Sequence, residues 1–217
     1  MSKAFHQIGV NVVDVQGDFT EVKEGSLAVP GTDKSYIEKV ALATKRLKEA
    51  GLTVFATQDW HPPDHVSFCT NHIGKKPFDV IKVGDRTQVL WPPHCVQNTE
   101  NAKILIDAKL FEGIIHKGMH SEFDSYSGFK DDGEQRTEMD SILKENGIEK
   151  LVIYGIATDY CVKATAIDAI EAGYNVLVIK DLCRGISAET SSASLEEIEE
   201  AGGIVIESLD IERIERF

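Results

Sequence analysis

Short apolar runs alternate with segments of helical periodicity along most of this 217-residue sequence. Runs of about four to eight residues with few polar positions are typical of strands buried on both faces of a parallel sheet. Where such strands alternate with helices, right-handed crossovers lay the helices on both faces of one sheet. We therefore expect a three-layer α/β fold, with a mainly parallel, Rossmann-like six-stranded sheet between helices. The expected strands are residues 8–13, 52–57, 113–116, 151–154, 175–179 and 204–207, and the expected helices are 33–50, 102–108, 137–146, 158–173 and 190–201.

Length and composition are those of an ordinary globular chain. With 42% hydrophobic and 27% charged residues, the chain suits a single domain over residues 1–217. Its formal net charge of −13 argues against nucleic-acid or anionic-membrane partners, which need clustered lysine and arginine. A neutral or cationic small molecule is the expected partner, and homo-oligomerisation is left open.

The cysteines and the apolar runs bear on cellular location. Four cysteines, at positions 69, 95, 161 and 183, lack the paired short spacing of a disulfide framework or a zinc site. We expect reduced thiols and a cytoplasmic protein. Residues 1–7 contain no hydrophobic segment of the signal-peptide kind. No stretch approaches the roughly 18 apolar residues of a membrane span.

Residues 155–162, Gly-Ile-Ala-Thr-Asp-Tyr-Cys-Val, connect the expected strand 151–154 to a helix rich in small residues. Thr158 and Asp159 are types that often cap a helix, which places Cys161 in its first turn. There the helix dipole and the free N–H groups favour thiolate over thiol, so Cys161 is a candidate nucleophile. The competing interpretation is a small, inert, buried residue.

Charged residues also follow two other expected strands. Asp14 and Asp18 come after strand 8–13, and Lys117 comes after strand 113–116. The carboxyl ends of parallel strands form the edge where open α/β sheets place their chemistry. A lysine beside Asp14 would hold that carboxylate and any developing charge in place. Turn or cap aspartates and a solvated lysine are the alternatives.

The segment 58–101 shows little periodicity, and loops of this length in compact domains are usually functional. Asp59 and His61 stand two apart at a strand end, so their side chains point to one side and can share a metal ion, with His94 as a third ligand. A carboxylate with two imidazoles and open positions suits zinc, iron or manganese. Ordinary surface hydrogen bonding is the alternative. Trp91, Tyr126 and Phe129 are candidate pocket aromatics.

Taken together, these pieces resemble a known family. The segments Val-Asp-Val-Gln-x-Asp-Phe (13–19), Asp-Trp-His-Pro (59–62), Trp-Pro-x-His-Cys (91–95), Lys-Gly (117–118) and Gly-Ile-Ala-Thr-Asp-Tyr-Cys-Val (155–162) resemble the nicotinamidases among the isochorismatase-like cysteine hydrolases. The matching segments follow the family order and cover residues 8 to about 190. The resemblance implies a catalytic triad of Asp14, Lys117 and Cys161, an oxyanion hole from the N–H groups of Ala157 and Cys161, a divalent metal ion, most readily zinc, on Asp59, His61 and His94, and substrate contacts from Phe19, Trp91, Tyr126, Ile156 and Tyr160.

The implied activity is hydrolysis of nicotinamide to nicotinic acid and ammonia through a thioester, a step of NAD salvage, with pyrazinamide as a second substrate. The resemblance further implies a cis peptide bond at Ile156–Ala157, and in some members a histidine near His65 joins the metal. Residues 71–90 depart from the family pattern and could reshape the pocket mouth. Two alternatives stay open: a related amidase for another small amide, and a metal-binding module in which Cys161 senses oxidants.

Overall fold

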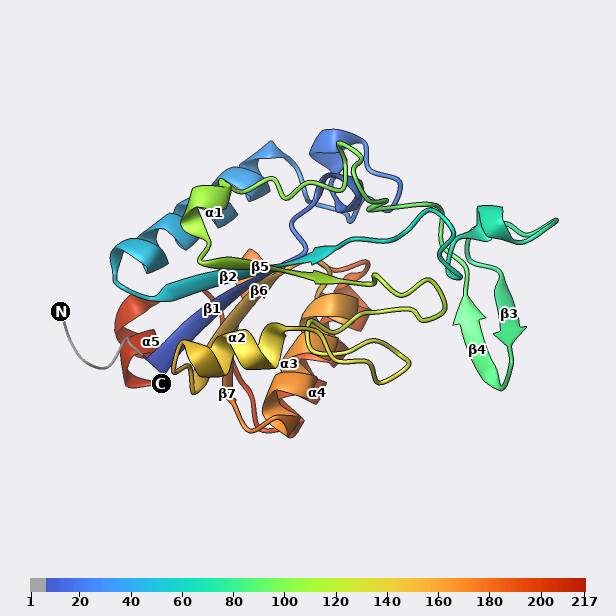
Figure 1. Cartoon of the computed structure of the whole chain (residues 1–217). Helices are drawn as coiled ribbons and strands as arrows, with labels where there is room; N and C mark the ends of the chain where they lie inside the picture. Colours follow the sequence, from blue (N-terminus) through green and yellow to red (C-terminus); the bar gives the residue numbers. More distant parts are fainter. Residues whose placement is uncertain (1–6) are drawn as a thin grey trace.

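The computed structural model describes residues 7–217, whose largest element is a six-stranded sheet in which every neighbouring pair of strands is parallel (Figure 1). The strand order is β5-β2-β1-β6-β7-β8, so the chain winds outward from β1 in one direction and then from β6 in the other. This confirms the expected parallel sheet. The strands are β1 (Ile8–Val13), β2 (Thr53–Asp59), β5 (Gly113–Lys117), β6 (Lys150–Gly155), β7 (Asn175–Ile179) and β8 (Ile204–Ile206).

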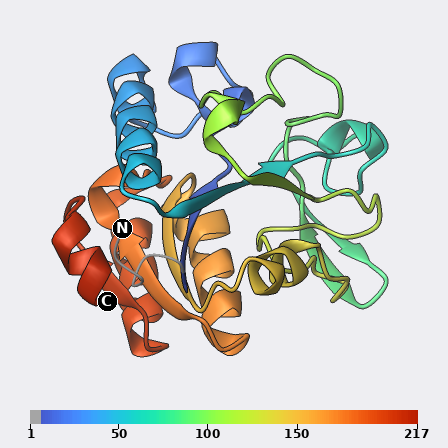
Figure 2. The same cartoon turned by 60° about the vertical axis from the view of Figure 1, so that its left-hand side comes forward.

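Helices cover both faces of the sheet (Figure 2). Helix α1 (Lys34–Glu49) lies on one face, and α2 (Met139–Glu145), α3 (Lys163–Glu171) and α4 (Ala188–Glu200) lie on the other. Local sequence explains the helix ends: the Asp33 carboxylate accepts the Tyr36 amide at 2.9 Å to begin α1, and Gly51 with φ of +102° follows its end. The three-layer expectation is therefore confirmed.

Three local expectations are wrong or incomplete. Residues 102–108 form no α-helix, and only Ala108 enters a short 3-10 helix (Ala108–Leu110). Their backbone pairs elsewhere: the Leu105 amide donates to Val15 O, and Ala102 O accepts hydrogen bonds from two buried glutamine side chains. The segment 58–101 contains a hairpin, β3 (Val80–Val83) and β4 (Arg86–Val89), whose turn includes Gly84 at φ +59°. A short helix, α5 (Ile211–Arg216), ends the chain and is too short for its periodicity to be recognised.

The strand order decides where a site can form. Strands β1 and β6 are neighbours at the point where the winding direction reverses, and crevices open there beyond the carboxyl ends of the strands. Asp14 follows β1, Cys161 follows β6, and Lys117 and Asp59 end β5 and β2. In the described part of the chain, no helix combines the length and apolarity needed to cross a membrane. The expectation about residues 1–6 lies outside the described residues.

Candidate active site

Asp14, Lys117 and Cys161 meet at the carboxyl edge of the sheet. The Lys117 ammonium lies 3.0 Å from Asp14 Oδ2 and 3.6 Å from Cys161 Sγ, and it donates to Ser125 O at 3.1 Å. Asp14 is completely buried, and its other oxygen accepts the Thr57 hydroxyl at 2.7 Å. The Asp14 backbone has φ of +46°, a left-handed conformation that non-glycine residues seldom adopt and that often marks functional sites. The sequence-predicted triad residues thus share one buried cluster.

The electrostatics of this cluster set the charge of each group. Burial raises the pKa of Asp14, and the nearby Asp59 carboxylate raises it further, while Lys117 and the Thr57 hydrogen bond act in the opposite direction. Burial would lower the pKa of Lys117, but Asp14 and Asp59 together hold it well above its usual value. Lys117 therefore stays cationic, and Asp14 has the upward shift that suits a group taking and returning a proton.

The expected thiolate at Cys161 is not supported. Burial raises the pKa of the Cys161 thiol well above its usual value, and the Asp14 and Asp59 carboxylates add to this, outweighing the opposing effect of Lys117. The first turn, Thr158–Val162, is also wider than an α-helical turn, since the Val162 amide donates to Ala157 O. Burial by the tertiary fold thus overrides the local helix-end effect, and the resting group is a neutral thiol.

Thr158 and Asp159 do not cap this helix with their side chains. The Asp159 carboxylate instead accepts the Ile186 amide at 3.1 Å and the Thr190 hydroxyl at 2.5 Å, which ties the turn to the start of α4. The Ile156–Ala157 peptide bond is cis, as the resemblance implied. Within residues 7–217, the Ala157 amide donates no hydrogen bond to another group, so its N–H is free to meet an oxyanion.

Asp59, His61 and His94 form a second buried cluster beside the first. One ligand atom from each lies within 4.8 Å of the others. His61 Nδ1 is 2.8 Å from Gly118 O and His94 Nδ1 is 2.8 Å from Pro92 O, so both Nδ1 atoms are donors and both Nε2 lone pairs are available. His61 Nε2 is buried, lies 3.4 Å from Asp59 Oδ2 and has no hydrogen-bond partner among residues 7–217. A carboxylate and two oriented imidazoles fit a divalent metal ion.

The charges of the cluster also favour a cation. Burial would raise the pKa of Asp59, but Lys117 and His61 lower it below its usual value, so Asp59 is anionic. Burial and the neighbouring His61 lower the pKa of His94 to about 4, which leaves His94 neutral at physiological pH. Burial would lower the pKa of His61, but Asp59 raises it above the usual value. Metal binding would therefore compete with protonation of His61.

His65 lies next to this cluster without sharing it. Its ring centroid is 4.4 Å from that of His61, but its nitrogens are both used: Nδ1 is 3.3 Å from the Ser67 amide and Nε2 is 3.0 Å from Phe123 O. Its Nε2 therefore donates to a carbonyl and has no lone pair for a metal. Asp18 likewise lies outside the triad, because its Oδ2 accepts the Cys95 amide at 2.7 Å and anchors the loop that carries His94.

A cavity of about 720 Å³ opens onto both clusters. Cys161, Asp59 and Ala157 lie at its buried end, while Phe78 and Ile186, which are 63% and 49% exposed, lie at its mouth. Ile156 is fully buried and does not line the cavity, and Phe129 packs against Tyr174 in the core. The other aromatic residues expected to contact substrate all line the cavity: Phe19, Trp91, Tyr126 and Tyr160.

Several residues at the site were not expected from the sequence. The sequence predicts only that Thr57 ends a strand, yet its hydroxyl donates a hydrogen bond to Asp14. Asp124 lines the cavity and accepts hydrogen bonds from Trp91 and Tyr126. Phe78 contributes from the segment before the hairpin. Because these residues lie far apart in the sequence and stand in no recognisable motif, only the folded chain brings them together.

Comparisons with known proteins agree with this architecture. The Isochorismatase domain family matches residues 10–210. The nicotinamidase of Acinetobacter baylyi is 45% identical over 183 residues, covering 83% of this chain and 82% of its own length. The yeast nicotinamidase bound to the inhibitor nicotinaldehyde superposes with a TM-score of 0.83 at 32% identity, covering 92% of this chain and 99% of that one.

A third relative has a metal in its structure. The pyrazinamidase of Pyrococcus horikoshii, solved in complex with zinc, superposes with a TM-score of 0.77 at 36% identity and covers 92% of this chain and 98% of its own. The family match spans most of the sequence, and both solved relatives superpose over 92% of this chain. By sequence and by fold, this chain belongs to the isochorismatase family, in the branch that contains the nicotinamidases.

Proposed function

We propose that this protein is a nicotinamidase, which hydrolyses the carboxamide of nicotinamide to nicotinic acid and ammonia and also accepts pyrazinamide. The observation that carries the proposal is the juxtaposition, at one cavity, of the Cys161 thiol beside Asp14 and Lys117 with the metal-binding group formed by Asp59, His61 and His94. The relatives named above are nicotinamidases or a pyrazinamidase, which supports the same substrate class. The product would feed a salvage route to NAD.

The first half of the reaction needs the thiolate of Cys161, whereas the resting site contains the neutral thiol. Asp14 takes the Cys161 proton as the thiolate attacks the amide carbon, so the thiolate exists only where it is used. Lys117 remains cationic throughout and stabilises the negative charge that moves from Asp14 to sulfur. The N–H groups of Ala157 and Cys161 receive the oxyanion, where removing one such donor typically slows the rate about 100- to 1,000-fold.

The second half returns the proton and releases the acid. Protonated Asp14 gives its proton to the departing nitrogen, so ammonia leaves and a thioester remains on Cys161. Asp14, ionised again, takes a proton from water, which attacks the thioester carbonyl and meets the same two N–H groups. Collapse of that intermediate releases nicotinic acid, and Asp14 returns the proton to the sulfur of Cys161. Each proton removed is thereby returned within one cycle.

Asp59, His61 and His94 would hold a divalent metal ion, with zinc favoured and iron or manganese as the other candidates. Bound there, the ion would act as a Lewis acid toward the pyridine nitrogen, which would help to orient the ring and withdraw electrons from it. Three features suit these side chains to binding a metal ion: His94 is neutral, Asp59 is anionic, and hydrogen bonds from both histidine Nδ1 atoms leave the Nε2 atoms as ligands. Phe19 and Trp91 would bracket the ring.

The testing experiment measures ammonia release from nicotinamide by metal-replete protein, beside Cys161→Ala. Release by the wild type and none by the variant supports both the reaction and the nucleophile. If neither nicotinamide nor pyrazinamide yields ammonia, the proposal is wrong, and a panel of other small amides tests the related-amidase alternative.

The redox-sensor alternative is not favoured. Sensor cysteines are exposed and have a low pKa, whereas Cys161 is 7% exposed and burial raises its pKa. A cytoplasmic location is also part of the proposal, supported by four cysteines that are all free. The oligomeric state is left open, and light scattering measures it.

A further inference from the structure

Asp124 is a buried carboxylate to which the mechanism above assigns no role. It is 3% exposed, lies in the loop after β5 and lines the cavity. Its Oδ2 accepts three hydrogen bonds from side chains: Gln88 Nε2 at 2.8 Å, Trp91 Nε1 at 3.2 Å and the Tyr126 hydroxyl at 3.0 Å. Because two of these donors belong to the aromatic residues that line the cavity, one carboxylate oxygen sets the orientation of both rings.

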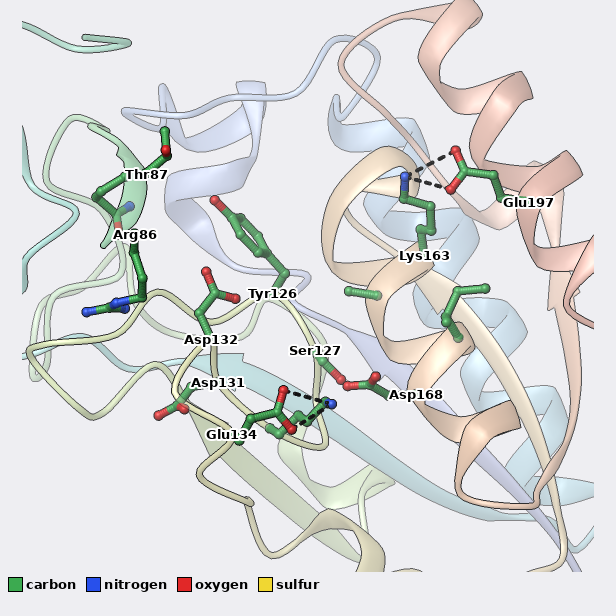
Figure 3. Close-up of a pocket in the computed structure, with 14 residues that line it drawn as sticks. Arg86, Thr87, Tyr126, Ser127, Asp131, Asp132, Glu134, Lys163, Asp168 and Glu197 are labelled. Carbon is green, nitrogen blue, oxygen red and sulfur yellow. Dashed lines mark hydrogen bonds and ion pairs between the residues drawn. The ribbon is translucent and has the colours of Figure 1, made fainter. Parts of the chain in front are cut away.

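The ring of Tyr126 is positioned by this hydrogen bond as well as by packing. Tyr126 lines the cavity that holds Cys161 and also a second hollow of about 660 Å³, so it stands between two open spaces. Figure 3 shows Tyr126 standing between Arg86 and Thr87 on one side and the helices that carry Lys163 and Glu197 on the other. The Tyr126 ring packs against the core and against Tyr160, with centroids 5.7 Å apart, and the hydrogen bond to Asp124 fixes the direction of its hydroxyl.

The same short segment is anchored to the catalytic cluster. Asp124 Oδ1 accepts the Ser125 amide at 3.0 Å, and Ser125 O accepts the Lys117 ammonium at 3.1 Å. Asp124, which orients the aromatic residues of the cavity, is therefore adjacent in sequence to Ser125, which contacts the catalytic Lys117. These two contacts fix the distance between the aromatic residues that line the cavity and the thiol of Cys161.

The third donor connects the hairpin to the cavity. Gln88 lies on β4, is 5% exposed, and reaches Asp124 across 36 residues of sequence. Val89 on β4 and Phe78 just before β3 also line the cavity. The Phe78 ring packs edge to face against the Trp91 ring, with ring centroids 6.0 Å apart. The segment that departs from the family pattern is thus joined to the pocket walls through one buried carboxylate.

We infer that Asp124 is a positioning residue for the amidohydrolase reaction. Its hydrogen bonds to Trp91 and Tyr126 orient the aromatic side chains that contact the heteroaromatic ring of the substrate. Its hydrogen bond to Gln88 holds the β3–β4 hairpin against those side chains. This inference rests on the proposed function. Asp124 does not contact the reacting atoms, so its loss weakens ring binding in the ground state and the transition state alike and raises KM with little change in kcat.

The test compares Asp124→Asn with the wild type, using nicotinamide and metal-replete protein. Asparagine keeps the shape of the side chain but loses the charge and one acceptor oxygen. We expect KM to rise about 10-fold, which corresponds to about 1.4 kcal/mol, while kcat changes less than about 3-fold. The indole N–H resonance of Trp91, assigned with Trp91→Phe, should move upfield because it loses a charged acceptor. Asp85→Asn, an exposed aspartate in the turn of the β3–β4 hairpin that lines neither hollow, is the matched control and should leave both readouts unchanged.

A double-mutant cycle shows whether Asp124 acts through the aromatic residues. In a Trp91→Phe, Tyr126→Phe background, both donors are absent, so adding Asp124→Asn should change KM less than about 2-fold. Equal effects in the two backgrounds would overturn the inference, as would an unchanged KM in Asp124→Asn or a fall in kcat with KM constant.

One further variant keeps the inference testable if Asp124→Asn does not fold. Tyr126→Phe removes a single hydroxyl and should raise KM about 3- to 5-fold, so an unchanged KM contradicts the inference. Failure of the proposed function is recognised separately: wild-type protein then releases no ammonia, and the inference falls with it.

Discussion

The Lys117 ammonium lies 2.5 Å from Asp59 Oδ1, so the proposed catalytic lysine is ion-paired directly with a proposed metal ligand. The two residues are register partners at the ends of the adjacent parallel strands β2 and β5. Asp14 lies on the other side of the same ammonium, at 3.0 Å. One buried cation therefore balances two buried carboxylates and joins the two halves of the site.

Replacing this cation should damage both stability and activity. In Lys117→Met the side-chain length is kept, but Asp14 and Asp59 are left buried without their partner. Breaking a buried ion pair from one side typically destabilises a protein by about 3–5 kcal/mol. We expect a loss of this size in urea unfolding and no measurable ammonia release. Lys39→Met, at an exposed ion pair with Asp181, is the control and should change stability by less than about 1 kcal/mol. Similar stabilities of the two variants would contradict the burial argument.

Thr57→Val tests Asp14 as the general base. The Thr57 hydroxyl bond lowers the pKa of Asp14, so removing it raises that pKa further. A base must be ionised to take the Cys161 proton, and activity is therefore lost as the pH falls through the Asp14 pKa. We expect the acidic limb of the kcat/KM profile to move to higher pH by about one unit, equivalent to about 1.4 kcal/mol.

The matched control for that shift is Thr44→Val. It removes another buried hydroxyl contact, to the Tyr154 hydroxyl at 2.9 Å, which is outside the site. Thr44→Val should lower stability without moving the pH profile. A profile that shifts equally in both variants, or a shift to lower pH in Thr57→Val, would argue against Asp14 as the base.

Gly118→Ala should disturb the metal site without altering any proposed ligand. A Cβ at Gly118 would lie 2.3 Å from Cε1 and 2.6 Å from Nδ1 of the His61 ring, and the φ of +66° disfavours alanine as well. The ring must therefore tilt away from its position and lose the bond to Gly118 O. We expect zinc affinity, measured by chelator competition, to fall about 10- to 100-fold. Gly74→Ala, with φ of +74° and open space around it, is the control for backbone strain alone.

Asp59→Ala distinguishes a template role of the metal group from a chemical one. The variant lacks one of three ligands, so bound metal measured by mass spectrometry should fall well below one ion per chain. If the ion mainly orients the pyridine nitrogen, KM rises more than single-turnover hydrolysis at saturation slows. A metal-depleted variant with an unchanged KM would rule out that role.

Local patterns were sufficient for most of the sheet. Strands 8–13 and 175–179 match the structure to the residue, because a short apolar run between polar boundaries has one way to be buried in a parallel sheet. Residues 102–108 were assigned wrongly for a non-local reason: Ala102 O is the acceptor for Gln16 and Gln58, so tertiary partners took the place of helical hydrogen bonds. The β3–β4 hairpin was missed because its strands have only four residues each.

The sequence by itself determined the α/β class, the strands and the residue types that stand at their carboxyl ends, since periodicity and strand-end position are properties of neighbouring residues. Only the tertiary structure decided how those groups behave. Cys161 stands where a helix end should favour a thiolate, yet burial and two nearby carboxylates raise its pKa and hold it as a thiol. His65 carries the same ring as His61, but its Nε2–H donates a hydrogen bond to Phe123 O, whereas the Nε2 of His61 faces Asp59. Solvation and hydrogen-bond partners come from residues distant in sequence, so protonation and ligand capacity are settled by the fold.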